Sequence, residues 1–169
     1  MMIRLFLFLI MCTPLLSVAP AYAASKQYRA LASQLVDEAE QALQGDEIDS
    51  NIAANIASNI DRADELANLA LTADPSNVKA YWVKARAQQA KGNNEQSLHL
   101  LHIGLQLNPE NIAALNLQGD IALAVNNLEQ AETSLKNLRT ICGQSCAAAN
   151  KLQAALDLFK QTNPPKNKE

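Results

Sequence analysis

Aromatic residues make up only 4% of this 169-residue chain, which has a single tryptophan and five glycines. β-Branched residues are also sparse, and no segment shows the alternation that is typical of a strand. Alanine, leucine, asparagine and glutamine dominate, and the turn-forming residues separate segments of about a dozen residues with apolar positions at helical spacing. These shortages and this spacing predict an all-α fold.

The chain also lacks the residues that most reactions need. It has no glycine-rich phosphate loop, only two histidines, and no serine in the context of a nucleophile elbow. We therefore expect no enzyme activity and no cofactor.

Neither sign of charge is concentrated along the sequence. The chain has 14 Lys and Arg against 17 Asp and Glu, and they are mixed rather than arranged in a basic stripe. A protein that follows nucleic acid phosphates needs such a stripe. Nucleic acid is therefore not an expected partner.

One apolar run is present, at the start of the chain. Arg4 precedes the apolar segment 5–12, and the small-residue triplet 21–23 follows it, which is the pattern of a secretory signal peptide cleaved after Ala23. A retained membrane anchor is the alternative, but Pro14 and neighbouring polar residues interrupt the run short of the ~20 apolar residues that a span needs. We expect a periplasmic or secreted protein, in residues 24–169, with no stable membrane insertion.

Turn motifs recur at a fixed distance. Pro75 and Pro109 are 34 residues apart, which is the length of a tetratricopeptide repeat. Within units 78–111 and 112–145, large and small residues fall at the positions where that family has them: Tyr81, Ala85, Gly92, Ser97, Leu101, Gly104 and Pro109, then Leu115, Gly119, Ala131 and Leu135. The chain resembles the tetratricopeptide family over both units. The resemblance implies a right-handed α-solenoid of antiparallel helix pairs, about seven helices in all, closed by a C-terminal capping helix.

The repeat register predicts how the remaining segments are organised. Residues 24–77 are expected to form a divergent helix pair, in which Ala63, Ala67 and Ala70 match a second helix of the family. Its first helix, 26–43, is amphipathic, with one apolar face formed by Tyr28, Leu31, Leu35, Ala39 and Ala42. Ile52, Ile56 and Ile60 are expected to pack in the core, with a ligand-binding asparagine ladder as the alternative for the adjoining Asn51, Asn55 and Asn59. Residues 146–161 form the capping helix, and 162–169 a disordered tail.

In the family, the first helix of each unit lines a concave binding groove. The matching positions here are Lys79, Trp82, Arg86 and Gln89 in one unit and Ala113, Asn116, Asp120 and Leu123 in the next. Trp82 beside an arginine has the composition of a binding hot spot. The alternative for Trp82 is packing against the helix that ends near Thr72. The resemblance implies a protein or an extended peptide as the partner.

Loss of the signal peptide would leave two cysteines, Cys142 and Cys146, around an inter-repeat turn. In an oxidising compartment such a pair favours a structural disulfide. A redox centre is disfavoured because three residues intervene and the first cysteine closes a helix, and a metal site lacks further ligands. Gly143 can adopt the left-handed conformation that ends a helix, and Ser145 can cap the next one.

Two other groups have weaker claims to chemistry. His99 and His102 lie three residues apart but at outward positions of the repeat, so solvated histidines are favoured over a metal site. The acidic segment 46–51 lacks the glycine and the closing glutamate of a calcium loop.

The sequence as a whole favours a non-catalytic extracytoplasmic adaptor that binds a protein partner in the groove. A thiol–disulfide helper that uses Cys142 and Cys146 is one alternative. A structural subunit of a cell-envelope assembly, which would use apolar flanks rather than the groove, is another.

Overall fold

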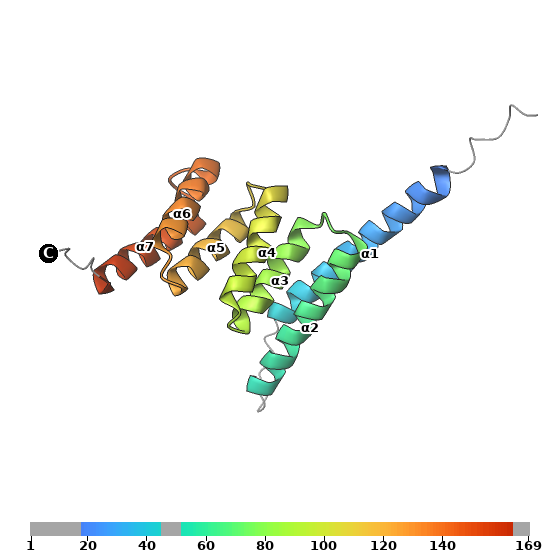
Figure 1. Ribbon diagram of the computed structural model, residues 1–169, viewed down its shortest axis with the longest axis horizontal. Helices are drawn as coiled ribbons and strands as arrows, with labels where there is room; N and C mark the ends of the chain where they lie inside the picture. Colours follow the sequence, from blue (N-terminus) through green and yellow to red (C-terminus); the bar gives the residue numbers. More distant parts are fainter. Residues whose placement is uncertain (1–17, 45–51, 164–169) are drawn as a thin grey trace, which may run out of the picture.

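The computed structural model describes residues 18–44 and 52–163, with side chains from 26–44 and 56–163 (Figure 1). The described residues are helical and include no strand, which confirms the all-α prediction. The helices are α1 (Val18–Gln44), α2 (Ile52–Ala73), α3 (Val78–Ala90), α4 (Asn94–Leu107), α5 (Ile112–Ala124), α6 (Leu128–Cys142) and α7 (Ala147–Thr162).

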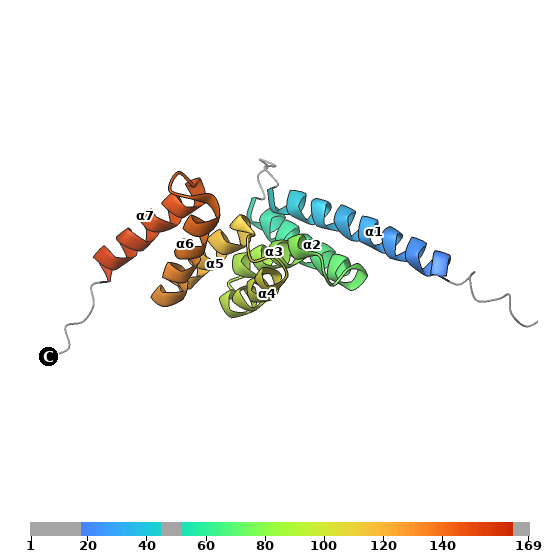
Figure 2. The same ribbon diagram turned by 90° about the horizontal axis from the view of Figure 1, so that it is seen from above.

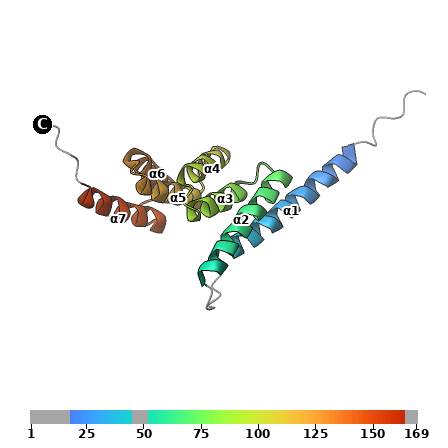
Figure 3. The ribbon, with the colours of Figure 1, turned by 60° about the horizontal axis from the view of Figure 1, so that its bottom comes forward.

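Helices that follow one another in sequence pack against one another, so the molecule is an elongated row with α1 and α7 at opposite ends (Figure 2). Further contacts join α1 to α3, α3 to α5, and α5 to α7. Figure 3 shows α4 and α6 on one side of this row and α3, α5 and α7 on the other. Helices α3, α5 and α7 therefore share one side of the molecule. None of the described helices has the length and hydropathy needed to cross a bilayer.

The 34-residue period of the sequence has a structural counterpart. Helices α3 and α5 begin 34 residues apart, and α4 and α6 do the same. Asn77 and Asn111 cap α3 and α5 in the same way, each accepting a hydrogen bond from the backbone N–H three residues later, at 3.1 and 3.0 Å. The turns before them also match, since Asp74 and Asn108 each accept from the backbone N–H two residues on.

The turns inside the two units match as well. Gly92, between α3 and α4, has φ of 81°, and Asn126, 34 residues later between α5 and α6, has φ of 60°. Glycine and asparagine are the residues that most readily adopt this left-handed conformation. Both turns therefore reverse the chain by the same backbone device.

Small residues lie where the helices of a unit approach closely. A Cβ atom on Gly104 would be 3.2 Å from the Cβ of Tyr81, so this glycine on α4 lies directly against Tyr81 on α3. Ala85 is fully buried, and its carbonyl oxygen accepts a hydrogen bond from the Ser97 hydroxyl at 2.7 Å. These residue sizes thus set the distance between α3 and α4.

The core consists of three clusters. The N-terminal cluster comprises Ala32, Val36, Ala39, Ala63, Ala67, Ala70, Ala80, Val83 and Ala87. The central cluster comprises Ala85, Leu100, Leu101, Ala114, Leu117 and Ile121. The C-terminal cluster comprises Leu115, Ala122, Ala131, Leu135, Leu138, Ala149, Leu152 and Leu156. Ala63, Ala67 and Ala70, whose spacing matches a second helix of the tetratricopeptide family, are all fully buried.

Two expectations about the N-terminal pair are wrong in part. The buried side of α1 is formed by Ala32, Val36 and Ala39, whereas Tyr28 and Leu31 are 58% and 47% exposed. Alanine on this side lets α1 approach α2 closely, and the larger residues are displaced to the edge of the contact.

Ile56 is the second exception. It is 50% exposed, although Ile60 packs against the N-terminal cluster as expected. Helix α2 has 22 residues and α3 has 13, so α2 is roughly 33 Å long against roughly 20 Å for α3. The first turns of α2 therefore extend past the helix that would cover them.

Several expected segments lie outside the described residues: most of the signal peptide, the acidic segment 46–51, and most of the tail 162–169. Residues 18–23, at the end of the expected signal peptide, belong to α1. The expected capping helix is α7, one residue later at each end than predicted.

Candidate functional site

Helix α3 presents the first half of the predicted groove. Lys79, Trp82, Arg86 and Gln89 recur at intervals of three or four residues, so they follow one side of the helix. Trp82 is half-buried and packs against both the N-terminal and the central clusters. Trp82 therefore agrees in part with both hypotheses, packing in the core and exposure for binding, because part of the indole contacts the core and part remains accessible.

The Arg86 guanidinium lies over the Trp82 ring, with its central carbon 5.2 Å from the ring centroid. This is cation–π geometry, which fixes the orientation of both groups. Because Trp82 is held from beneath by two core clusters, the pair forms a rigid platform at the surface.

Lys79 is occupied by α1. Its ammonium lies 2.9 Å from an oxygen of Asp37 and 2.6 Å from an oxygen of Glu40. The hydrogen bonds to Glu40 and then to Asp37 raise the pKa of Lys79 above 10.5. Lys79 therefore joins α3 to α1 and adds no net positive charge to the surface.

Helix α5 presents the second half of the predicted groove and contacts α3. The Asn116 amide donates to Asp120 at 3.2 Å, and Lys151 of α7 lies 3.4 Å from the same carboxylate oxygen. Leu123 packs against the C-terminal cluster, and Ala113 is exposed. The polar part of the α5 row is consequently a chain from Asn116 through Asp120 to α7.

One atom in this chain has no partner. The Asn116 Oδ1 atom is buried and accepts no hydrogen bond from any described group. Buried polar atoms are usually satisfied, so an exception of this kind calls for an explanation.

We call the residues Lys79, Trp82, Arg86, Gln89, Asn116 and Asp120 the α3–α5 surface. The helices that carry these residues contact each other and lie on one side of the row (Figure 3). The sequence placed each of these side chains on its helix correctly, but it did not indicate the salt bridges that occupy Lys79 and Asp120.

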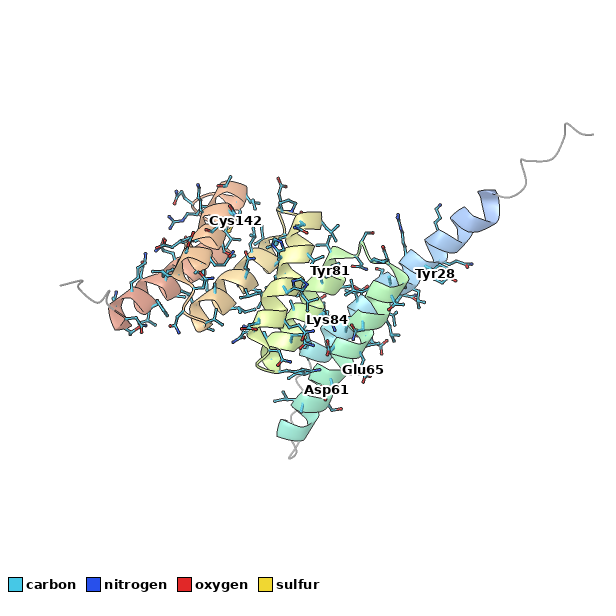
Figure 4. The ribbon with its side chains drawn as sticks, viewed as in Figure 1. Tyr28, Asp61, Glu65, Tyr81, Lys84 and Cys142 are labelled. Carbon is cyan, nitrogen blue, oxygen red and sulfur yellow. A yellow bond between two sulfur atoms is a disulfide. The ribbon has the colours of Figure 1, made fainter. Side chains whose placement is uncertain are left out.

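A buried polar junction between α2 and α3 was not anticipated. Asp64 accepts hydrogen bonds from Lys84 at 2.7 Å, Gln88 at 2.8 Å and Lys91 at 2.8 Å. Lys91 also lies 2.9 Å from an oxygen of Asp61. Figure 4 shows Asp61 and Lys84 near this junction, on α2 and α3. Lys84 and Gln88 are 8% and 5% exposed, which is rare for such polar side chains.

Burial raises the pKa of Asp64, but the hydrogen bonds from Lys84, Lys91 and Gln88 together lower it by more. The pKa of Asp64 therefore lies below 3.8. The same hydrogen bond to Asp64, followed by that to Asp61, raises the pKa of Lys91 above 10.5. Asp64 and Lys91 are therefore ionised at neutral pH. The function of the junction is to join helices, because every carboxylate in it faces a lysine.

Two hollows lie outside the α3–α5 surface. One, of about 490 Å³, lies between α1 and α2 and is lined by Tyr28, Leu31, Leu35, Leu69, Thr72 and Ala73. Figure 4 labels Tyr28, on α1. The other, of about 350 Å³, lies on α6 beside Lys136 and Arg139. Three residues of the predicted apolar face of α1, Tyr28, Leu31 and Leu35, thus line an open hollow.

The Sγ atoms of Cys142 and Cys146 lie 2.02 Å apart, at disulfide distance, with 5.4 Å between their Cα atoms (Figure 4). The pair spans the turn between α6 and α7. Gly143 has φ of 73°, in the left-handed region as predicted. The residue at the N-cap position of α7 is Cys146, not Ser145, and it makes no side-chain capping bond. The asparagine cap of the two earlier turns is therefore replaced by a covalent link.

The remaining candidates show no assembled site. His99 and His102 are exposed, and His102 lies 3.0 Å from the Gln106 side-chain nitrogen. Among the residues that the structure describes, no three His, Cys, Asp or Glu side chains group as metal ligands would.

No protein-family model matches the chain, and no curated protein shows significant similarity to it.

Proposed function

We propose that this protein is a non-catalytic, tetratricopeptide-like adaptor that binds a protein or an extended peptide on the α3–α5 surface. In this proposal the helices form antiparallel pairs stacked in a right-handed solenoid, and the α3–α5 surface lies in its concave groove. The signal pattern places the mature protein in the periplasm or outside the cell.

The observation that supports the proposal most directly is the Trp82–Arg86 pair. Tryptophan and arginine are the residues that most often dominate binding energy at protein interfaces. A stacked and partly accessible pair anchored on two core clusters loses little conformational freedom when a partner binds.

The test is the double substitution Trp82→Ala with Arg86→Ala, used as bait in affinity capture from cell-envelope extract. We expect the partner captured by the unchanged protein to be lost, with helicity by circular dichroism unchanged. A matched control is Leu158→Ala with Lys136→Ala, which removes an exposed apolar residue and an exposed cation from α7 and α6. Capture of the same partner by the Trp82/Arg86 variant would show that the α3–α5 surface is not the binding site.

The hollow between α1 and α2 favours a second candidate, a structural subunit of an envelope assembly. Tyr28, Leu31 and Leu69 are each about half exposed around this hollow, and clustered apolar side chains are typical of an interaction site. Light scattering after size-exclusion chromatography distinguishes the two functions. An assembly that Leu69→Glu disrupts and the Trp82/Arg86 double variant leaves intact would support the structural subunit.

A further inference from the structure

We infer that the α3–α5 surface selects an extended peptide segment in which an aspartate or glutamate adjoins a large apolar residue. This inference rests on the proposed function and specifies the chemistry of the partner.

The charge balance around Arg86 is the first argument. Most cations of the described residues lie beside a carboxylate, as do Arg29, Arg62, Lys79, Lys84, Lys91, Lys151 and Lys160. Arg86 pairs with none of the described carboxylates, although it is half-buried. Its neighbours along the surface, Lys79 and Asp120, are already compensated by α1 and α7. Arg86 is therefore the charged residue of the α3–α5 surface that no described group of opposite charge compensates.

A carboxylate is the ligand that fits this charge. The guanidinium is planar and offers paired N–H donors, which match the two oxygens of a carboxylate. Partial burial and stacking on Trp82 remove part of its hydration, so an ion pair formed there is screened less than one at the open surface.

The indole supplies the apolar half of the recognition. Trp82 is half-buried, and the Arg86 guanidinium lies over its ring. An apolar side chain next to the acidic residue of the peptide can cover the accessible part of the indole while the carboxylate reaches Arg86. Because the indole is fixed by two core clusters, little order has to be gained on binding.

Two amides indicate that the partner is extended. The Gln89 side chain, one turn beyond Arg86, has no hydrogen-bond partner among the described residues, and Asn116 Oδ1 on the neighbouring helix is unsatisfied. Asparagine and glutamine side chains both donate and accept, so each amide can bond a peptide main chain that reaches it. A peptide that bonds both amides as well as Arg86 has to reach from α3 to α5. We therefore expect the carboxylate to belong to an internal residue of the peptide rather than to a chain end.

The experiment is selection from a random peptide library displayed so that every peptide continues at its C-terminus into a carrier. The baits are the unchanged protein, Arg86→Gln, Arg86→Glu and the control Lys136→Glu. Lys136 is a second cation that pairs with no described carboxylate, but it is exposed on α6. We expect the unchanged protein and Lys136→Glu to enrich peptides with Asp or Glu beside a large apolar residue, and Arg86→Glu to enrich Lys or Arg at that position.

Binding of one enriched peptide, synthesised with both ends capped, then gives the size of the effect. Loss of a charge-assisted hydrogen bond in Arg86→Gln should weaken binding by about tenfold or more. Enrichment that survives Arg86→Glu with its acidic residue would overturn the inference but leave the adaptor function standing. Binding that requires a free C-terminal carboxylate would do the same, whereas no enrichment by the unchanged protein would count against both.

Discussion

Different interactions stabilise the helix packing at the N-terminal end and at the C-terminal end of the molecule. The N-terminal cluster is alanine except for Val36 and Val83, and the interface of α2 with α3 adds the polar junction around Asp64. The C-terminal cluster contains five leucines and is fastened by the Cys142–Cys146 pair. At both ends these contacts attach the outer helices to the central ones.

The difference follows from how closely the helices approach. Alanine lets α1, α2 and α3 come close together, but it buries little apolar area per residue. Polar contacts at short range then contribute a larger share of the attachment, and those contacts depend on pH. Leucines bury more area, and their contribution is largely independent of pH. We therefore expect the shortening of a buried side chain to lower stability more at the C-terminal end, and a fall in pH to lower stability more at the N-terminal end.

The largest effect is expected from Leu152→Ala. Leu152 is fully buried and fills the space between α7 and α5. It packs so closely on Gly119 that a Cβ atom added to this glycine would lie only 2.4 Å from the Leu152 Cδ2 atom. Removing it should lower the free energy of unfolding by about 2–5 kcal/mol, measured by urea denaturation. Leu158→Ala, on the same helix but 61% exposed, is the control and should change stability by less than about 1 kcal/mol. Equal losses in the two variants would mean that α7 is not docked through Leu152.

The second effect is expected from Asp64→Asn, which leaves the buried Lys84 ammonium without an opposite charge. We expect a loss of about 2 kcal/mol at neutral pH. Because the folded-state pKa of Asp64 lies below 3.8, its contribution to stability is complete above the unfolded pKa and is lost as the pH falls through the folded pKa. The unchanged protein should therefore lose stability in that range by a margin that Asp64→Asn does not show.

Asp74→Asn is the matched control for this titration. The pKa of Asp74 is also lowered, mainly by a hydrogen bond from Ser76, but asparagine occupies the equivalent position at Asn108 and makes the same turn.

Hydrogen exchange should show α2 and α3 opening in acid before α6 and α7. If all helices open together at the same pH, the two ends do not differ in the way that their contacts indicate.

The repeat register predicted more of the structure than composition did. Gly104, Ala85 and Ser97 lie at the expected close approaches because a fixed helix spacing tolerates only small side chains there. The register is weakest before Val78, where periodicity alone grouped the exposed Tyr28 and Leu31 with Leu35, Ala39 and Ala42, which do pack in or against the N-terminal cluster. Apolar spacing shows that Tyr28 and Leu31 share a face, but only the position of α2 decides whether that face is covered.

The candidate site divides in the same way. The register placed Trp82 and Arg86 on one side of α3, because that depends only on helix geometry. The partners of Lys79 and Asp120 lie 42 and 31 residues away in sequence, so no local pattern could show them. The Asp64 junction was missed for the same reason, although polar residues at the apolar-facing positions of Lys84 and Gln88 were a usable signal.

The smallest effect is expected from the cysteine pair, and it separates a structural disulfide from a redox centre. The link closes a short loop, with a sequence separation of four, so in the chain-entropy model it stabilises the fold by at most about 2 kcal/mol. Cys142→Ser with Cys146→Ser should lower the midpoint of urea denaturation slightly and speed hydrogen exchange in α7, since Cys146 at the N-cap position makes no capping bond of its own. Peptide binding on the α3–α5 surface should not change.

Free-thiol titration of the unchanged protein should find both cysteines oxidised and resistant to glutathione, as a structural disulfide is. A pair that exchanges readily with glutathione, and whose loss leaves stability unaltered, would instead favour a thiol–disulfide helper, because a strained or exposed link is then kept for its reactivity rather than for holding α7.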